Sequence, residues 1–406
     1  MRQILELRGL EQQYIDEFFK HDSKDSQKNA IKRFEQLGFP TNNSEDWKFT
    51  DISVILSNKF KLATQKDAEI DKILELIQCK EEKNTIVFIN GFYSHSKLSS
   101  KDIDITLITA NHADSDDAFT NLNLAFNLIT TSISIKKPIP DPICIINICS
   151  EKESMNHPRI NIIAQKDSKA TVVEIFTGTS NKYFVNSVTD IELKENAEIE
   201  HIKLQLEADD ALNIAKTNAN INRNAKYSSF AISIGSKLSR NILNAVLNEE
   251  GASAILNGLY FTNREQQSDH YTLIDHKKAN TASTQLYKGI LDGNSNAVFV
   301  GRVIVQKNAQ KISSTQLNKN MLLSKHALIN TKPQLEIFAD DVKCTHGATV
   351  GRLSDEEIFY LQSRGISIET AKMMLTNAFA LEIIEKISCK TARDKISNLW
   401  RNRCLI

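Results

Sequence analysis

A small residue that opens a strand-like run recurs at a nearly constant interval through the middle of the chain. The alanines at these openings are Ala170, Ala197, Ala225, Ala252 and Ala279, which are 27, 28, 27 and 27 residues apart. A steady period of this length is typical of a solenoid, in which each repeat covers the apolar edge of its neighbour. Because alanine is a common residue, chance recurrence is the alternative.

The segments between these alanines are short and rich in β-branched and aromatic residues, as in VVEIF, FAISI and AVFVGRVIV. Such segments favour strands over helices. Leucine-rich patterning is absent, and so is the glycine-punctuated six-residue rhythm of left-handed acyltransferase coils. The sequence therefore predicts a mainly β protein built on a right-handed parallel β-helix over 131–346, with two or three short strands per turn.

Two apolar stripes at helical spacing precede the repeat. Tyr14 and Phe18 lie on the first stripe, and Gly38 is placed to end the second helix. The strand-like run TIVFI at 85–89 follows. We therefore expect an N-terminal helical or mixed region over 1–130.

Helical patterns also follow the repeat. Ser354 and Glu357 form a capping-box pattern. Ser367 can cap the next helix, whose apolar face includes Met374. We expect a C-terminal helical region over 347–406.

No segment is typical of an exported, membrane-bound or nucleic-acid-coating protein. Lysine plus arginine balances aspartate plus glutamate at 50 each, so no basic coat for nucleic acid is expected. The first residues interleave charges with apolar side chains, unlike a secretory signal, and the apolar run at 143–146 is too short to span a bilayer. Six cysteines without a CxxC pair argue against a disulfide framework. We expect a cytoplasmic protein with reduced thiols and with neither nucleic acid nor a membrane among its partners.

The segment DDVKCTHGATVG at 340–351 gathers two carboxylates, a thiol and an imidazole. In a strand, Asp340, Cys344 and His346 would share one face, with the thiol and the imidazole about 7 Å apart. They could then ligate one metal ion, or two atoms of one cluster. A nucleophile with its base is one alternative, and a buried cysteine beside a hydrogen-bonded histidine is another. Because two ligands cannot hold iron or zinc alone, a metal site would have to be shared with another chain.

The residues around this segment resemble a known family. The C-terminal signature of the SufB/SufD family, scaffold proteins of the SUF iron-sulfur cluster assembly machinery, is closely similar to PQLEIFADDVKCTHGATVG at 333–351 and IFYLQSRGI at 358–366. The family is also similar to DHYTLIDH at 269–276 and NSEDWKFTDI at 43–52. The likeness runs over most of the chain and is loose over 53–160.

The resemblance implies a parallel β-helix between helical regions and a non-catalytic role. Neither GxGxxG nor GxxxxGK[ST] occurs in this chain, so it has no recognisable phosphate-binding loop. Family members associate with the ATPase SufC, which would supply the nucleotide site instead. Cluster assembly is attributed to the interface between SufB and SufD, where His346 would be a ligand and Cys344 would lie close by. The motif KCTHGATVG resembles the SufD branch of the family, and so does the lack of cysteine over 150–343.

The expected function is therefore that of a scaffold subunit. It would pair with a SufB-like paralogue, dock a SufC-like ATPase, donate ligands to a transient iron-sulfur cluster at the shared interface and support iron acquisition. It would have no nucleotide site of its own. Expressed alone, it could form a homodimer.

A short helix near the end of the chain carries a candidate docking surface. Phe359 and Tyr360 lie between the acidic Glu356 and the basic Arg364. Core packing of a helical hairpin is one reading. A surface that docks the ATPase is the other, and the resemblance implies that the ATPase binds in this region.

Two further groups of residues admit a functional reading. Asp269, His270, Asp275 and His276 look like a metal set, but His270 and Asp275 fall on opposite faces of a strand, which favours ladder residues. Trp47 is either part of a docking surface or a buried anchor of the N-terminal region, and we favour the anchor.

The alternative function is that of a polysaccharide-binding or polysaccharide-cleaving β-helix protein, because that fold often displays acidic residues along a groove. Cleavage would need paired carboxylates on adjacent coils, and no such column is found in the sequence. A purely structural solenoid would depend on neither iron nor an ATPase.

Overall fold

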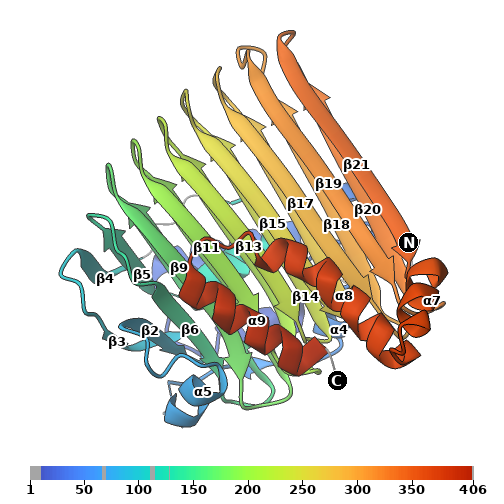
Figure 1. Cartoon of the computed structure of the whole chain (residues 1–406). Helices are drawn as coiled ribbons and strands as arrows, with labels where there is room; N and C mark the ends of the chain where they lie inside the picture. Colours follow the sequence, from blue (N-terminus) through green and yellow to red (C-terminus); the bar gives the residue numbers. More distant parts are fainter. Residues whose placement is uncertain (1–10, 66–69, 110–114, 128, 405–406) are drawn as a thin grey trace.

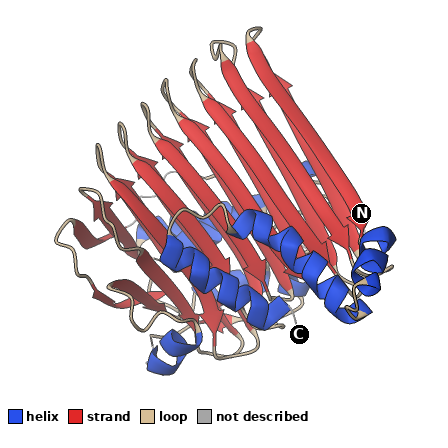
Figure 2. Cartoon of the chain, in the orientation of Figure 1, coloured by secondary structure: helices blue, strands red, loops and turns tan. Residues whose placement is uncertain are grey.

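The computed structural model describes residues 11–65, 70–109, 115–127 and 129–404. Two sheets face each other, and the chain alternates between them, so that each pair of strands makes one turn of a β-solenoid (Figure 1). About eight such turns stack within the described residues. Helices lie outside the sheets (Figure 2). The protein is mainly β, and the predicted parallel solenoid is confirmed.

The first sheet contains β1 (Lys61–Leu62), β4 (Ile103–Thr109), β5 (Ile129–Ile135), β7 (Ser154–Asn156), β8 (Arg159–Ala164), β10 (Tyr183–Leu193), β12 (Leu212–Ile221), β14 (Leu238–Leu247), β16 (Gln267–His276), β18 (Asn296–Val305) and β20 (Leu328–Ile337). The second sheet contains β2 (Asn84–Ile89), β3 (Phe92–Lys97), β6 (Ile143–Cys149), β9 (Lys169–Gly178), β11 (Glu198–Gln205), β13 (Lys226–Ile234), β15 (Ser253–Thr262), β17 (Ala282–Leu291), β19 (Ile312–Leu322) and β21 (Val342–Arg352).

The helices before the solenoid are α2 (Gln12–Phe18), α3 (Asp25–Leu37), the 3-10 helix η1 (Glu45–Trp47), α4 (Ser53–Leu56), α5 (Ile70–Leu76) and α6 (Ala118–Phe126). Those after it are α7 (Asp355–Ser363), α8 (Ile368–Ile384) and α9 (Lys390–Cys404). In Figure 1, α8 and α9 cross the outer face of the second sheet.

A residue with positive φ marks one corner of the solenoid in successive turns. These residues are Asp167, Asn196, Asn224, Gly251, Asn280 and Lys311. Asparagine, aspartate and glycine tolerate the left-handed conformation better than other residues, so they predominate here. The residue that follows each of them is small or apolar and buried: Ser168, Ala197, Ala225, Ala252, Thr281 and Ile312. This corner is the physical origin of the periodic alanine signal.

The strand register shows that two of the five alanines do not occupy equivalent positions. Ala197, Ala225 and Ala252 occupy equivalent positions in adjacent turns, as predicted. Ala170 pairs with Ile199 and therefore lies two positions later. Ala279 lies two positions before the equivalent residue, Thr281. The interval between equivalent residues from Ser168 to Ile312 varies from 27 to 31, because the turns of the solenoid differ in length.

Glycines make room for large side chains inside the solenoid. A Cβ atom on Gly258 would lie 2.1 Å from the ring of Tyr287, and one on Gly289 would lie 2.2 Å from the ring of Tyr260. Both tyrosines are fully buried. The interior is close-packed, so these positions cannot gain a methyl group without displacing a ring.

The helices α2, α3, α4 and α6 pack on the outer face of the first sheet, whereas α5 packs against the second sheet through Ile73. Tyr14 and Phe18 on α2 are buried in a cluster that includes Leu212 and Val298 from that sheet. The second helix, α3, ends just before Gly38, which adopts a φ of 66°. Both features agree with the expectation from the sequence.

Trp47 is a buried anchor, as favoured from the sequence. Its side chain is 8% exposed, its ring stacks on Phe119 at 5.2 Å, and the guanidinium carbon of Arg240 lies 3.9 Å from its ring centre. Arg240 belongs to β14 and also donates hydrogen bonds to Thr50 and to the carbonyl of Asp46. Arg240 thus helps to fix the N-terminal region to the first sheet through one cation–π contact and two hydrogen bonds.

The C-terminal helices begin as their caps predict. Ser354 accepts a hydrogen bond from the amide of Glu357, and Ser367 accepts one from Thr370. The predicted apolar face of α8 is wrong at Met374, which is 46% exposed. Met373 in the first half of this helix is also exposed within the described chain, whereas Ala371 is buried.

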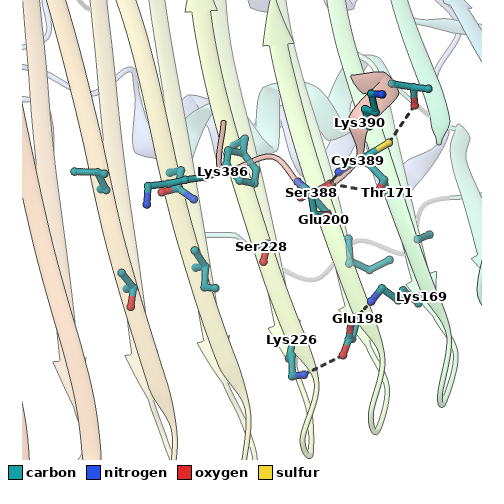
Figure 3. A pocket seen from close by; sticks show the side chains of 18 of the residues that line it. Lys169, Thr171, Glu198, Glu200, Lys226, Ser228, Lys386, Ser388, Cys389 and Lys390 are labelled. Carbon is teal, nitrogen blue, oxygen red and sulfur yellow. Dashed lines mark hydrogen bonds and ion pairs between the residues drawn. The ribbon is translucent and has the colours of Figure 1, made fainter. Parts of the chain in front are cut away.

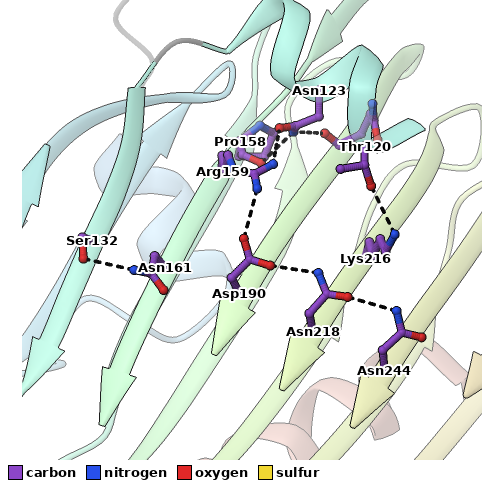
Figure 4. Close-up of polar contacts among 11 residues, drawn as sticks. Thr120, Asn123, Ser132, Pro158, Arg159, Asn161, Asp190, Lys216, Asn218 and Asn244 are labelled. Atoms are coloured by element: carbon purple, nitrogen blue, oxygen red, sulfur yellow. Dashed lines mark hydrogen bonds and ion pairs between the residues drawn. The ribbon is translucent and has the colours of Figure 1, made fainter. Parts of the chain in front are cut away.

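Polar side chains form ladders across the outer face of the first sheet (Figure 4). Arg159 donates to Asp190 at 3.1 Å, Asn218 donates to the other carboxylate oxygen of Asp190 at 2.8 Å, and Asn244 donates to Asn218 at 3.0 Å. Each residue sits one turn further along the solenoid. Such ladders satisfy the polar groups that stacking brings together.

The two ends of the solenoid differ. At the N-terminal end, β4 pairs antiparallel with β5 and β3 pairs antiparallel with β2, which breaks the parallel stack. At the C-terminal end, β20 and β21 pair only with the preceding turn in the part of the chain described here. The C-terminal end therefore presents two open strand edges.

Candidate metal centre at the open end

Cys344 and His346 lie on β21, the last strand of the solenoid. Cys344 pairs with Ser314 and His346 pairs with Gln316 on β19. Both partners are buried, at 2% and 0% exposure, so this column of side chains points into the solenoid. Because paired residues in a parallel sheet share a face, the thiol and the imidazole point inward together, as the sequence predicts.

The burial of the two side chains differs although they share a face. Cys344 is half-buried and packs at the margin of the inner core, whereas His346 is exposed. Both are reached by solvent only because no further turn covers them. Partial burial raises the pKa of the Cys344 thiol, which opposes the nucleophile alternative, because a reactive cysteine needs a lowered pKa.

A hydrogen-bonded polar column lies beneath these two residues. The Nε2 atom of His276 and the hydroxyl of Ser283 are 2.9 Å apart, and the hydroxyls of Ser283 and Ser314 are 2.8 Å apart. In the neighbouring column Gln316 donates to Gln285 at 2.6 Å. The inner surface that reaches the open end is therefore polar and already ordered before any partner arrives.

The carboxylates before β21 do not join this site as expected. The strand begins at Val342, so the expectation that Asp340 shares a strand face with Cys344 and His346 is wrong. Asp340 and Asp341 are exposed, and the backbone of Asp341 is bonded to the preceding turn. They belong to the turn that leads into β21.

The ligand set of the open end is incomplete within this chain. Across the described residues, no group of three or more histidine, cysteine, aspartate or glutamate side chains is close enough to hold a metal ion. Structural zinc and iron-sulfur sites need about four ligands. A thiol and an imidazole are suitable ligands for such metals, but they require others from outside the chain.

The candidate docking residues lie on α7. Phe359 and Tyr360 are 72% and 59% exposed, and Glu356 and Arg364 are exposed beside them. Arg364 lies over the ring of Tyr360 at 5.4 Å. Glu356 and Tyr360 line a hollow of about 370 Å³ that α8 completes with Leu375. These aromatic rings are therefore surface groups and not the core of a hairpin.

The second group of predicted candidates is structural. His270 and His276 point into the solenoid and are buried, whereas Asp269 and Asp275 lie on the outer face of β16. Asp269 lies 3.8 Å from the guanidinium of Arg240, and burial raises its pKa to about 6. The ladder interpretation agrees with these positions.

A large concave surface lies between the outer face of the second sheet and the last two helices (Figure 3). Its cavity volume is about 1300 Å³. Its charged groups pair with one another: Glu198 bridges Lys169 at 2.8 Å and Lys226 at 3.0 Å. Glu200 accepts the backbone amides of Ser388 and Cys389 before α9. Glu200 thus ties the start of α9 to the second sheet within this groove. The charges of Glu198, Lys169 and Lys226 in the groove neutralise one another.

The sequence did not reveal which residues lie beneath Cys344 and His346. Ser314 and Gln316 are identified only by the register of β19 and β21. The signal in the sequence is the residue with positive φ at the corner before each strand. Lys311 is that residue before β19, and its amide donates a hydrogen bond of 2.6 Å to the carbonyl of Asp341, the residue before β21. Lysine rarely adopts a positive φ, so the sequence pattern of Asn, Asp or Gly at the corner is broken at Lys311, and the last turn could not be recognised from it.

Fold and site together define a parallel β-solenoid protein with a thiol and an imidazole side by side at an open end. The family model described as SUF system FeS cluster assembly, SufBD core domain, matches residues 147–379, and that of the SufBD N-terminal region matches residues 2–126. The chain therefore belongs to the SufBD family of SUF iron-sulfur cluster assembly proteins.

Relatives in three organisms are similar over most of their length. An iron-sulfur cluster assembly SufBD family protein of Synechocystis sp. is 30% identical over 89% of this chain and 86% of its own. The iron-sulfur cluster assembly protein SufD of Escherichia coli is 30% identical over 88% and 87%. A chloroplastic protein of Arabidopsis thaliana, ABCI7, is 29% identical over 89% and 82%. The resemblance to SufD is confirmed, and it replaces the polysaccharide alternative.

None of the helices in the described ranges is both long and apolar enough to cross a membrane.

Proposed function

We propose that this chain is a non-catalytic scaffold subunit that pairs with a SufB-like paralogue through the open end of its solenoid. Cys344 and His346 would then be ligands, shared with the partner, of a transient iron-sulfur cluster. The observation that carries the proposal is their position on the inner face of the last turn, beside two open strand edges.

The open end has the properties of an interface. Leu328, Phe338 and Val350 at or next to β20 and β21 are 63%, 61% and 49% exposed. An exposed strand edge with apolar side chains attracts another strand, and a protein normally covers it. A paralogous solenoid would continue both sheets and bury these side chains. A second copy of this chain could do the same when the paralogue is lacking.

The proposal includes a second partner, an ATPase of the SufC type. Glu356, Phe359, Tyr360 and Arg364 supply an aromatic surface flanked by opposite charges. Aromatic residues and arginine are enriched at the centres of protein interfaces. Met373 and Met374 extend this surface along α8. The ATPase would contribute the nucleotide site, for which this sequence has no phosphate-binding motif.

Reconstitution of the complex tests the ligand assignment. His346→Ala and Cys344→Ser are each expressed with a SufB-like paralogue and a SufC-like ATPase, and iron content and cluster absorbance are measured anaerobically. Lys343→Ala is the matched control, because Lys343 directly precedes Cys344 and lies on the opposite face of β21. We expect His346→Ala to lower the cluster content sharply with complex formation unchanged.

Cys344→Ser separates a ligand from a packed thiol. A fall comparable to that of His346→Ala would identify Cys344 as a ligand, and a smaller fall would leave it a packing residue. Wild-type cluster content with His346→Ala would overturn the proposal. The same result with Lys343→Ala as with His346→Ala would point to a general disturbance of the strand.

A further inference from the structure

Two cysteines that are far apart in the sequence meet under the C-terminal helix. Cys79 lies in the loop after α5, and Cys144 lies on β6 in the first full turn of the solenoid. Both are 0% exposed. The side chain of Lys395 reaches Cys79 from α9, Cys144 donates a hydrogen bond to Cys79, and Glu82 completes the group from the segment before β2. Three separate parts of the chain therefore converge on one pair of thiols.

The contacts make the two thiols chemically unequal. The Nζ atom of Lys395 donates to the sulfur of Cys79 at 3.3 Å and to the carboxylate of Glu82 at 2.5 Å. A hydrogen bond from the Cys144 thiol, helped by the charge of Lys395, lowers the pKa of Cys79. The same bond and burial raise the pKa of Cys144. These contacts favour the thiolate form at Cys79 over the thiolate form at Cys144.

A structural role alone does not account for this arrangement. A buried ammonium group is costly unless it is paired, and two apolar side chains would fill the same space without that cost. A metal site is also opposed, because the ammonium of Lys395 occupies the position beside Cys79 where a cation would sit. No metal-binding set of three such groups occurs in the described residues. A cation beside a thiolate is the arrangement that activates cysteine for oxidation.

We propose that Cys79 and Cys144 form a redox-active dithiol that peroxide-class oxidants convert to a disulfide. The Cys79 thiolate attacks one oxygen of the peroxide, the O–O bond breaks, and the hydroxide that leaves takes a proton to become water. The resulting sulfenic acid is then attacked by the sulfur of Cys144, which loses its proton as a second water departs. Two thiols and one hydrogen peroxide give one disulfide and two waters. This inference does not depend on the proposed scaffold function.

The location of the two cysteines determines how an oxidant reaches them and what their oxidation would change. Gln78 and Lys80, on either side of Cys79, are exposed, so a small opening of this surface loop admits an oxidant. The disulfide would tie the loop to β6. It would also remove the thiolate that Lys395 contacts, leaving Glu82 as the partner of Lys395 in this group. Oxidation would therefore change the contacts that hold α9 on the second sheet.

The test is oxidation of the folded full-length chain with hydrogen peroxide, followed by trapping of free thiols with an alkylating reagent and peptide mass spectrometry. We expect a peptide pair linked through Cys79 and Cys144 and reversal by a dithiol reductant. The variant Lys395→Met keeps the volume of the side chain and removes its charge. It should slow disulfide formation near neutral pH by about tenfold, because the thiolate fraction falls.

Cys389→Ser is the matched control, because this half-buried thiol lies outside the pair, and disulfide formation should be unchanged. Cys144→Ser should leave Cys79 as the alkylated or over-oxidised residue. Recovery of Cys79 and Cys144 as free thiols, while Cys389 in the same folded sample is oxidised, would overturn the proposal, and this result needs no variant. If Lys395→Met formed the disulfide as fast as wild type, the ammonium of Lys395 would not be what activates Cys79.

Discussion

At the scale of single residues, the interior of the solenoid allows little change of volume. The ring of Tyr260 occupies the space where a side chain on Gly289 would begin, and the nearest oxygen of Asn320 is 2.6 Å from the same point. A methyl group there must displace a buried ring that donates a hydrogen bond to Asn320. Position 289 is thus specified by packing and not by backbone conformation.

We expect Gly289→Ala to lower the free energy of unfolding by about 1–3 kcal/mol, the usual cost of overpacking a core. Chemical denaturation followed by circular dichroism measures the change. Gly351→Ala on β21 is the control, because no atom lies within 4 Å of its would-be Cβ, and it should leave stability within about 0.5 kcal/mol of wild type. Equal stability of the two variants would contradict this account of the interior.

A buried histidine makes stability depend on pH. Burial, with Lys203 as the smaller cause, lowers the pKa of His270 from 6.5 to about 3. The folded state therefore keeps this imidazole neutral, while the unfolded state binds a proton below pH 6.5. Because the unfolded state then holds more protons, stability is lost as the pH falls through the range from 6.5 to 3.

For His270 this loss should reach about 2 kcal/mol between pH 7 and pH 5. The measurement is the free energy of unfolding of wild type and His270→Gln at both values. The variant should show the smaller difference between the two, whatever its absolute stability. A larger or identical difference in His270→Gln would show that this histidine does not couple folding to protons.

At the scale of elements, α7 depends on its N-terminal cap more than on burial. Ile358 is the buried residue of α7, and the helix packs mainly against α8. We expect Ser354→Ala to destabilise this helix by about 1 kcal/mol, because the amide of Glu357 loses its acceptor. Hydrogen exchange should be faster in the amides of α7 and unchanged in β21.

Ser363→Ala at the other end of the same helix is the comparison. Its hydroxyl donates to the carbonyl of Tyr360 and caps no amide, so exchange in α7 should stay close to wild type. Uniform exchange in all three proteins would mean that packing on α8 alone holds the helix. The cap matters for function if α7 carries the ATPase surface, since a frayed helix would not present Phe359 and Tyr360 together.

At the scale of the whole molecule, the open end should govern association. Val350 faces into the last turn and is 49% exposed, because no further turn covers it in the described part of the chain. Val350→Asp would place a charge in the proposed interface and should weaken self-association and pairing with a SufB-like paralogue by at least about tenfold, through an unpaired charge. Sedimentation velocity and co-purification measure the two effects.

Ile255→Asp is the matched substitution on the outer face of β15, where the side chain is 45% exposed. It should leave association unchanged, because that face is not an end of the solenoid. If Ile255→Asp weakened association as much as Val350→Asp, or if neither had an effect, the interface would lie elsewhere on the molecule.

The sequence by itself determined the class of fold, the capped helices and the shared face of Cys344 and His346. Each of these rests on local rules: period, N-cap chemistry and alternation along a strand. It misplaced Ala170, Ala279 and Asp340, because turn lengths vary and register is a property of paired strands.

The tertiary structure alone decided what lies beside what. It placed Ser314 and Gln316 beneath Cys344 and His346, and it brought Lys395 to Cys79 across 316 residues of sequence. Stacking of turns and docking of helices create such contacts, and neither leaves a local pattern in the chain. The exposure of His346 likewise depends on where the solenoid stops, since the same residue one turn earlier would be buried.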